Sequence, residues 1–368
     1  MQVQGRPTRT IWPSADARSV NIVDQRALPH TWVTQQLHSV EAAAEAIAGM
    51  AVRGAPLIGV TAAYGLALQA LVDVGDAALA DAAATLKATR PTAVNLAWAV
   101  DKTLTQLLAV PREQRAATAW SLAAALADAD VRTNAAIGDH GLALLRPLAA
   151  QKHARGDKRP LQILTHCNAG WLATVDWGTA IAPIYKLHAA GIAVHVWVDE
   201  TRPRNQGASL TAWELREAGV PHTVIADNAG GHLMQRGEVD AVIVGCDRVG
   251  ANGDVCNKIG TYLKALAAHD CGVPFYVAMP MSTLDLSIND GSQEIPIEER
   301  SAREVTHLAG RSASGEIVEV QLVPDGSVAA NPAFDVTPAR LVTALITEHG
   351  VIPATAAAIA TLVEGAAR

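Results

Sequence analysis

The sequence predicts an α/β protein, with a mainly helical N-terminal domain before a Rossmann-like domain that has a mainly parallel sheet. The prediction depends first on a change of hydrophobic period near residue 150, from helical spacing to short apolar runs that alternate with helices. It depends also on composition: half of the 368 residues are apolar, yet Phe and Tyr number only two and four. An interior of Ala, Val, Leu and Ile suits helices and buried parallel strands.

The N-terminal domain is placed at residues 1–150. From about 35 to 150 apolar residues recur three and four apart, as in "VTAAYGLALQALVD" and "AATAWSLAAALADADVRTNAAIG". The segment "QKHARGDKRP" at 151–160 interrupts this pattern with charge, Gly and Pro, which is typical of an exposed connection. We therefore assign residues 151–368 to the second, catalytic domain.

The second domain is predicted to contain five buried strands, because short Val- and Ile-rich runs alternate with helical stretches. The runs are residues 161–166, 191–200, 221–227, 239–247 and 273–279. No G-x-G-x-x-G follows any of them, so the dinucleotide fingerprint is missing. Residues 351–368 read as a final helix.

Composition and charge exclude several classes of function. The formal charge is −7 and no basic block stands out, so we expect no nucleic-acid partner. The start resembles no signal peptide and no apolar run is long enough to cross a bilayer, so we expect no membrane partner and a cytoplasmic protein. Four cysteines without CxxC spacing indicate free thiols, and no zinc pattern combines them with histidine. We expect no metal.

Polar residues at the ends of the predicted strands define a candidate site, since ligands of open parallel sheets lie beyond the carboxyl ends of the strands. This rule brings Cys167 and Asp247 to one edge of the sheet although they are distant in the chain. The other residues at that edge are Glu200, Thr201, Arg202, Asp227, Met279 and Pro280.

Cys167, in "ILTHCNAG", has two interpretations. It is either a small buried hydrophobe or a thiol whose pKa is lowered by the unpaired N–H groups of a following helix. His166 is not its expected partner, because adjacent side chains on a strand point to opposite faces.

Asp247 follows the apolar run "AVIVGC", which predicts a desolvated carboxyl with a raised pKa, able to act as a general acid. The alternatives are a salt bridge to Arg248 or a helix cap. Lys258 is interpreted either as an anion ligand at the start of a helix over 257–268 or as a solvated lysine at a helix end.

Two further segments suggest anion binding. In "VRGAPLIG", Arg53 and Gly54 precede Pro56 at the start of a predicted helix, where N–H groups and a guanidinium would cradle a phosphate. Arg90, Pro91 and Asn95 repeat that arrangement, which could be coincidence. The loop 199–215, "DETRPRNQGASLTAWEL", is polar enough for ligand contacts or an ion-pair network.

Nearly the whole chain, from about residue 10 to 350, resembles the methylthioribose-1-phosphate isomerase family of methionine salvage. The motifs that carry the resemblance include "RGAPLIGVTAAYG", "RPTAVNLAWA", "THCNAG", "ETRPRNQGASLTAWEL", "GCDRVGANGDVCNKIGTY" and "IPIEER". That family shares its fold with ribose-1,5-bisphosphate isomerase and with regulatory subunits of a translation initiation exchange factor, so fold alone does not decide function.

The resemblance implies that Cys167 and Asp247 are the catalytic pair. It implies that substrate is bound by Arg53, Gly54, Ala55, Arg90, Gln206, Asn257 and Lys258. The sequence departs from the family pattern at Ala129, Ser209 and Cys246.

The implied reaction converts an aldose 1-phosphate to the ketose 1-phosphate without a cofactor, and the implied assembly is a homodimer. Asp247 would protonate the ring oxygen, while Cys167 would act as a base or stabilise charge during a hydride shift. Trp12 and the loop near Pro280 are candidates for the pocket that holds the C5 substituent. The alternatives are isomerisation of 5-deoxyribose 1-phosphate or ribose 1,5-bisphosphate, or a noncatalytic regulatory subunit of the same fold.

Overall fold

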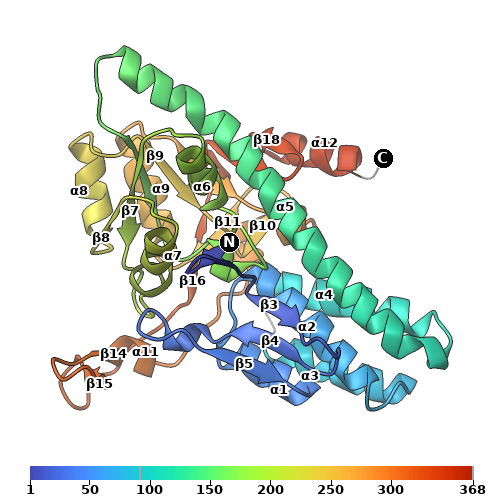
Figure 1. The fold of residues 1–368 in the computed structure, drawn as a ribbon. Helices are drawn as coiled ribbons and strands as arrows, with labels where there is room; N and C mark the ends of the chain where they lie inside the picture. Colours follow the sequence, from blue (N-terminus) through green and yellow to red (C-terminus); the bar gives the residue numbers. More distant parts are fainter. Residues whose placement is uncertain (91–92, 367–368) are drawn as a thin grey trace.

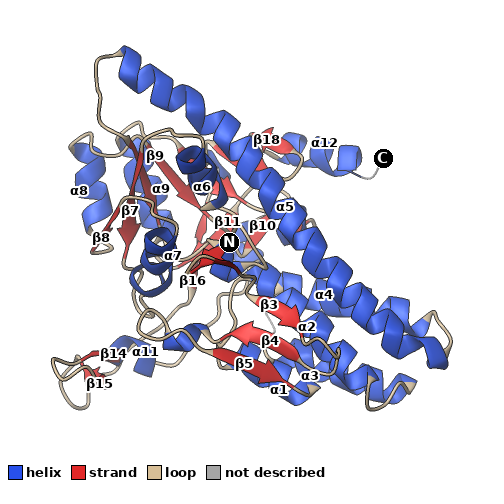
Figure 2. Ribbon diagram, viewed as in Figure 1, coloured by secondary structure: helices blue, strands red, loops and turns tan. Residues whose placement is uncertain are grey.

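A seven-stranded sheet forms the centre of the C-terminal half (Figures 1 and 2). The structure is a computed structural model that describes residues 1–90 and 93–366; Pro91 of the second predicted anion-binding segment lies outside these ranges. The strand order is β18-β17-β12-β9-β6-β7-β8, and all neighbours are parallel except β17 and β18. The strands are β6 (Leu161–Thr165), β7 (Val194–Asp199), β8 (His222–Ile225), β9 (Ala241–Val244), β12 (Phe275–Ala278), β17 (Ala344–Thr347) and β18 (Gly350–Ile352). The α/β class and all five predicted strands are confirmed.

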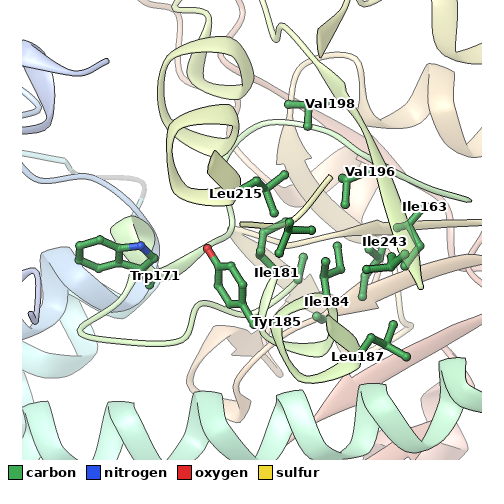
Figure 3. Close-up of a cluster of buried hydrophobic side chains, with 14 of the residues drawn as sticks. Ile163, Trp171, Ile181, Ile184, Tyr185, Leu187, Val196, Val198, Leu215 and Ile243 are labelled. Carbon is green, nitrogen blue, oxygen red and sulfur yellow. The ribbon is translucent and has the colours of Figure 1, made fainter. Parts of the chain in front are cut away.

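Alternate side chains of the inner strands enter two different cores, as a strand's period of two requires. One core packs Ile163, Val196 and Ile243 against α5 (Arg112–Ala154) and α6 (Ala182–Ala189), and part of it is drawn in Figure 3. The opposite core packs Leu164 and Val242 against three other helices. These are α8 (Ala229–Gln235), α9 (Thr261–Asp270) and α12 (Ala356–Ala366). The sheet is thus covered on both faces, which leaves its carboxyl edge open for a site.

The N-terminal half is mainly helical, as predicted. Its helices are α1 (Val40–Ala48), α2 (Ala55–Ala70), α3 (Asp76–Ala88), α4 (Val94–Leu108) and the first part of α5. α2 is buried on nearly every side, which explains why its sequence shows almost no polar face. Two small antiparallel sheets precede these helices in the chain. The first pairs two strands of two residues each, β1 (Gln2–Val3) and β2 (Arg6–Pro7). The second contains β3 (Ile11–Pro13), β4 (Val20–Val23) and β5 (Thr34–Leu37).

A second, four-stranded sheet was not predicted. Its order is β13-β10-β11-β16, from β10 (Arg248–Gly250), β11 (Val255–Lys258), β13 (Leu284–Asp285) and β16 (Phe334–Thr337). The prediction of a helix over 257–268 was wrong at its start: Lys258 ends strand β11, and helix α9 begins at Thr261. Asp335 caps α9 by accepting from the N–H groups of Gly260 and Tyr262 at 2.7 and 3.1 Å.

The segment that connects β13 to β16 contains two short helices and a projecting hairpin. The helices are α10 (Gly291–Glu294) and α11 (Arg303–Thr306), and the hairpin is β14 (His307–Arg311) with β15 (Ile317–Gln321). Figure 1 shows the hairpin extending away from the rest of the molecule. The remaining helix of the site region, α7 (Ala212–Glu217), follows a π-helical turn at Gly207–Thr211.

Helix α5 joins the two halves of the molecule (Figure 1). It packs against α2 and α4 at one end and against α6, β17 and β18 at the other. It continues to Ala154, so the first four residues of the predicted connection at 151–160 are helical. The division into domains at residue 150 stays a prediction. At the other end of the chain, residues 351 and 352 belong to β18, and the final helix is α12.

Within the ranges described above, no helix combines the length and the apolar character needed to cross a membrane.

Candidate active site

The site lies where the strand order of the main sheet reverses. From β6 the chain adds β7 and β8 on one side and then returns to add β9 on the other, so the ends of β6 and β9 diverge around a crevice. Cys167 follows β6 and Asp247 follows β9, and both line the same cavity. The prediction that topology brings these two residues together is confirmed.

The backbone at Cys167 leaves the strand conformation. β6 ends at Thr165, and Cys167 has φ +65°, a left-handed conformation that is uncommon for a residue with a side chain. Its N–H donates to Thr201 Oγ1 at 2.8 Å, and its carbonyl accepts from Thr211 Oγ1 at 2.7 Å. The thiol Sγ lies 3.3 Å from Gln206 Oε1. These side-chain contacts keep the strained residue in place.

His166 is held away from the thiol. Its Nδ1 lies 2.8 Å from Asp199 Oδ2 and its Nε2 lies 2.8 Å from the carbonyl oxygen of Ile259. Both ring nitrogens are therefore occupied, and the expectation that His166 does not pair with Cys167 is confirmed.

The predicted lowering of the Cys167 pKa was wrong. Burial raises the pKa of the thiol, and the nearby charges of Arg53 and Lys258 offset only part of that effect, while Asp247 adds to it. A helix does not follow the cysteine directly, so the expected N–H groups of a long helix are missing. The resting thiol is protonated at neutral pH.

Asp247 shows the behaviour expected from its sequence. Burial raises the pKa of its carboxyl, and the positive charges of Lys258, Arg90 and Arg53 oppose the rise. Its backbone N–H donates to the carbonyl of Cys256 at 2.9 Å, which fixes the residue at the start of the second sheet. The neighbouring Arg248 pairs with Asp285 at 3.1 Å, so that ion pair leaves the Asp247 carboxyl to the cavity.

The N-terminus of α2 forms one wall of the cavity. Gly54 is its N-cap with φ +98°, and a Cβ atom there would lie 2.3 Å from the carbonyl oxygen of Ala173. Only glycine fits this position. Pro56 stands in the first turn, as predicted, and the free N–H groups of a helix N-terminus favour an anion.

Four cationic side chains line the cavity: Arg53, Arg90, Arg248 and Lys258. The Nε atoms of Arg53 and Arg90 are buried without a hydrogen-bond partner among the described residues. Arg90 Nη2 forms an ion pair with Glu298 at 2.8 Å, while the Lys258 Nζ lies 4.4 Å from the ring centre of Phe334. Burial lowers the pKa of Lys258, and Cys167 and Asp247 would counteract this in their ionised forms. Cationic groups with unused donors in one enclosed space suit a phosphate.

The cavity brings together eight of the nine predicted site residues: Arg53, Gly54, Ala55, Arg90, Cys167, Gln206, Asp247 and Lys258. Asn257 lines an adjoining cavity that also contains Cys167 and Asp247. Its side-chain Nδ2 donates to Thr261 Oγ1 at 3.0 Å, at the start of α9.

The main cavity also has apolar lining residues. Its apolar lining comes from Met50, Ile58, Ala93, Ile295, Pro296 and Phe334. The candidate Trp12 packs against the core instead, and Pro280 lines the adjoining cavity. Ser209, the departure expected to bear on substrate, lines the groove next to the main cavity rather than the cavity itself.

One group of possible metal ligands occurs among the described residues: His166, Asp199 and Asp227. The Lys264 ammonium lies 3.1 Å from Asp199 Oδ2 and also donates to the carbonyl of Asp227. The Asp227 carboxylate accepts from the N–H groups of Thr201 and Arg202, each at 2.7 Å. Lys264 thus supplies the positive charge between these two acidic residues. The hydrogen bonds of Asp227 hold the chain that follows β7 in place next to Cys167.

Two residues of the site were not singled out from the sequence: Asn168 and Glu214. Asn168 Oδ1 accepts from Arg53 Nη1, and its carbonyl accepts from Arg53 Nη2 at 2.7 Å. The Asn168 Nδ2 donates to Glu214 Oε1 at 3.0 Å. For Glu214 the sequence did contain a signal: in "TAWEL" at 211–215, at the end of the polar loop, it is an acidic residue between the apolar residues Trp213 and Leu215.

Known proteins resemble this chain over its full length. Residues 51–354 match the model of the initiation factor 2 subunit family. A methylthioribose-1-phosphate isomerase of Rhodospirillum rubrum is 63% identical over 98% of this chain and 93% of the relative.

Two solved structures have the same fold. The 5-methylthioribose 1-phosphate isomerase of Pyrococcus horikoshii OT3 has a TM-score of 0.82 and 39% identity, covering 98% of this chain and 96% of the other. A protein from A. fulgidus named translation initiation factor eIF-2B, subunit delta, has a TM-score of 0.77 and 39% identity, covering 94% and 96%. The chain therefore belongs to the initiation factor 2 subunit family and, within it, to the methylthioribose-1-phosphate isomerases.

Proposed function

We propose that the protein converts 5-methylthioribose 1-phosphate to 5-methylthioribulose 1-phosphate, the reaction of methionine salvage, with Asp247 as general acid and Cys167 as the second catalytic residue. The observation that carries the proposal is one cavity lined by a thiol, a carboxyl with a raised pKa and four cationic side chains. The 63% identical relative carries the name of this activity.

The chemistry requires an acid because the anomeric oxygen of the substrate carries a phosphate, so the ring does not open freely. In the proposed step the C1–O bond of the ring breaks as Asp247 donates its proton to the ring oxygen. A general acid must be protonated to do this, and burial keeps the Asp247 carboxyl in that form.

The transfer of hydrogen from C2 to C1 has two possible routes. In one, Cys167 as thiolate removes the C2 proton to form an enol phosphate and then returns a proton to C1, while the C2 hydroxyl gives its proton to the Asp247 carboxylate. In the other, hydride moves from C2 to C1 as the ring opens, and the C2 hydroxyl loses its proton to the Asp247 carboxylate. The raised pKa of Cys167 favours the hydride route, since a protonated thiol is no base. In both routes Asp247 recovers its proton and no external oxidant is consumed.

The apolar wall of the cavity supports a methylthio substituent at C5. A second phosphate, as in ribose 1,5-bisphosphate, would need another cationic cluster, whereas the rest of the cavity lining includes the apolar residues Met50, Ile295 and Pro296. The test is to compare kcat/KM on three sugars: 5-methylthioribose 1-phosphate, 5-deoxyribose 1-phosphate and ribose 1,5-bisphosphate. Preference for the bisphosphate would contradict the proposal.

A noncatalytic regulatory role is the alternative that the likeness to an initiation-factor subunit raises. Such a module would bind a sugar phosphate without converting it. Binding of 5-methylthioribose 1-phosphate by calorimetry, with no ketose product after prolonged incubation, would support that role and refute the enzyme.

Three further expectations complete the proposal. We propose a homodimer, which sedimentation velocity tests directly, and a cytoplasmic compartment, which follows from the expected metabolic role. The reaction as written uses neither metal nor nucleotide, so turnover should be unchanged after dialysis against a chelator.

A further inference from the structure

Glu214 is a fully buried carboxylate whose hydrogen bonds come from uncharged donors. Its two oxygens accept four of them: Oε1 from Asn168 Nδ2 and the N–H of Leu172, and Oε2 from the N–H of Trp171 and the hydroxyl of Tyr185. The distances are 2.8 to 3.0 Å. In Figure 3 the Tyr185 hydroxyl points toward the helix that carries Leu215. Four donors fill the acceptor sites of an ionised carboxylate, because a protonated one would need an acceptor for its own hydrogen.

Glu214 determines which way the Asn168 amide faces. An amide has a donor end and an acceptor end, and a carboxylate accepts only from the donor end. Asn168 Nδ2 therefore faces Glu214 and, at 3.2 Å, Thr211 Oγ1. The Oδ1 end is left to face Arg53 Nη1.

Asn168 in turn holds the Arg53 guanidinium at two points. Side-chain Oδ1 and backbone carbonyl accept from Nη1 and Nη2, so the two bonds fix the plane of the group. Arg53 Nε has no partner among the described residues, and Arg53 lines both cavities that contain Cys167 and Asp247. The direction in which Arg53 presents its remaining donors depends on the Asn168 amide.

Residues 206–214, which include Glu214, also hold the loop that begins at Cys167 in place. The π-helical turn and the residues beside it make these contacts. Gln206 contacts the Cys167 thiol, and Thr211 donates to the Cys167 carbonyl. Glu214 accepts from the backbone N–H of Leu172, five residues further on. Gly170 leaves room for the carboxylate, because a Cβ there would lie 1.7 Å from Glu214 Oε2. The fit indicates that loop and helix are built around this side chain.

We propose that Glu214 is a positioning residue, which orients Arg53 for the substrate phosphate through the amide of Asn168. The inference depends on the proposed function in one respect, that Arg53 binds the phosphate. Burial raises the pKa of Glu214, and its hydrogen bonds from Asn168, Leu172 and Tyr185 and the charge of Arg53 oppose that rise.

The test is a double-mutant cycle with Glu214→Gln and Arg53→Met. In Glu214→Gln one oxygen becomes a donor, which removes the preference for one orientation of Asn168. We expect KM for 5-methylthioribose 1-phosphate to rise about tenfold, a loss typical of one charge-assisted hydrogen bond, with a smaller change in kcat. On the Arg53→Met background the same substitution should change KM less than about twofold, because the residue it acts through is gone.

Equal effects of Glu214→Gln on both backgrounds would overturn the proposal, since a purely structural role does not depend on Arg53. Asn168→Ala provides a second variant, with the same expected dependence on Arg53, for the case that Glu214→Gln does not fold. Glu217→Gln is the matched control: it lies one turn away on α7, pairs with Arg216 and should leave KM unchanged.

Binding of inorganic phosphate separates this proposal from the proposed function. Its dissociation constant, measured by calorimetry, needs no turnover and should follow the same cycle. If wild-type protein fails to isomerise the sugar but the phosphate cycle shows coupling, the function is wrong and the role of Glu214 stands. If turnover is normal but phosphate binding is equal in wild type and Glu214→Gln, the role of Glu214 is refuted.

Discussion

Cys167 and Asp247 follow neighbouring parallel strands, β6 and β9, at the point where the strand order of the sheet reverses. Burial raises the pKa of both side chains. Burial thus favours the protonated form of both groups, in a cavity that is also lined by positively charged side chains. This combination favours a bound phosphate and an acid next to it, and it leads to the first two predictions.

Replacing Asp247 by Asn should reduce kcat by about 10²–10⁴-fold, because an amide cannot donate a proton as an acid. In wild type, activity should fall as pH rises through the raised pKa of Asp247, where the carboxyl ionises. The variant should lack this alkaline limb, which a pH profile of kcat measures. Asp270→Asn, on an exposed residue at the end of α9, is the control and should behave as wild type. Normal turnover in the Asp247→Asn variant would remove Asp247 from catalysis.

Cys167 should react slowly with iodoacetamide at neutral pH, because the buried thiol is protonated. Its rate of alkylation, followed by peptide mass spectrometry, should rise with pH, and 5-methylthioribose 1-phosphate should protect it. Cys167→Ser should lose most activity, whereas Cys271→Ser, which lies outside the cavities described here, should not. Retention of full rate in Cys167→Ser would assign the thiol to packing alone.

Because of the buried carboxyl of Asp130, the free energy of unfolding should decrease as pH rises. Burial raises the pKa of its carboxyl from 3.8 to about 7. Between these values the unfolded chain has lost the proton that the folded chain keeps, so the free energy of unfolding falls with increasing pH, by about 1.4 kcal/mol per unit for one group.

The Asp130→Asn variant keeps an oxygen that can accept from the N–H of Val175 but does not ionise. Its melting temperature should therefore fall less between pH 4.5 and 7.5 than that of wild type. The melting temperature of the variant should still fall somewhat with pH, because other buried carboxyls, such as Asp247, also have raised pKa values. Identical slopes in the two proteins would show that Asp130 ionises normally when folded.

Gly54→Ala should damage both stability and binding. The φ of +98° disfavours alanine, and the new Cβ would meet Ala173 at less than van der Waals distance. We expect a loss of more than about 1 kcal/mol in the free energy of unfolding and a higher KM, because the start of α2 must shift. Gly231→Ala, where the nearest atom is 3.5 Å away, is the control. Denaturant titration and steady-state kinetics measure the two effects, and wild-type values for both would refute the assignment.

The main sheet could be predicted because its central strands are buried on both faces and read as uninterrupted apolar runs, such as "AVIV" in β9. Once these strands are in place, the rule for strand ends leads to Cys167 and Asp247 without knowledge of any relative.

The second sheet was missed because its strands are short and carry polar residues. β11 contains Asn257 and Lys258, which no strand pattern favours. A hairpin signal was nevertheless present, since Asn252-Gly253 separates the antiparallel strands β10 and β11, and Gly253 has φ +90°. The roles of Asn168 and Glu214 depend on tertiary contacts that no spacing in the sequence encodes.

The length of α5 has a consequence for how substrate reaches the cavity. One continuous helix of 43 residues is fastened to both halves, and separating them would strip one of its two sets of contacts. A wide hinge-like opening is therefore costly. Shorter pieces of chain line the cavity instead: Ile295 and Pro296 belong to its lining, and the segment they begin is tied to the rest of the molecule by ion pairs of Glu298 with Arg90 and of Glu304 with Arg204.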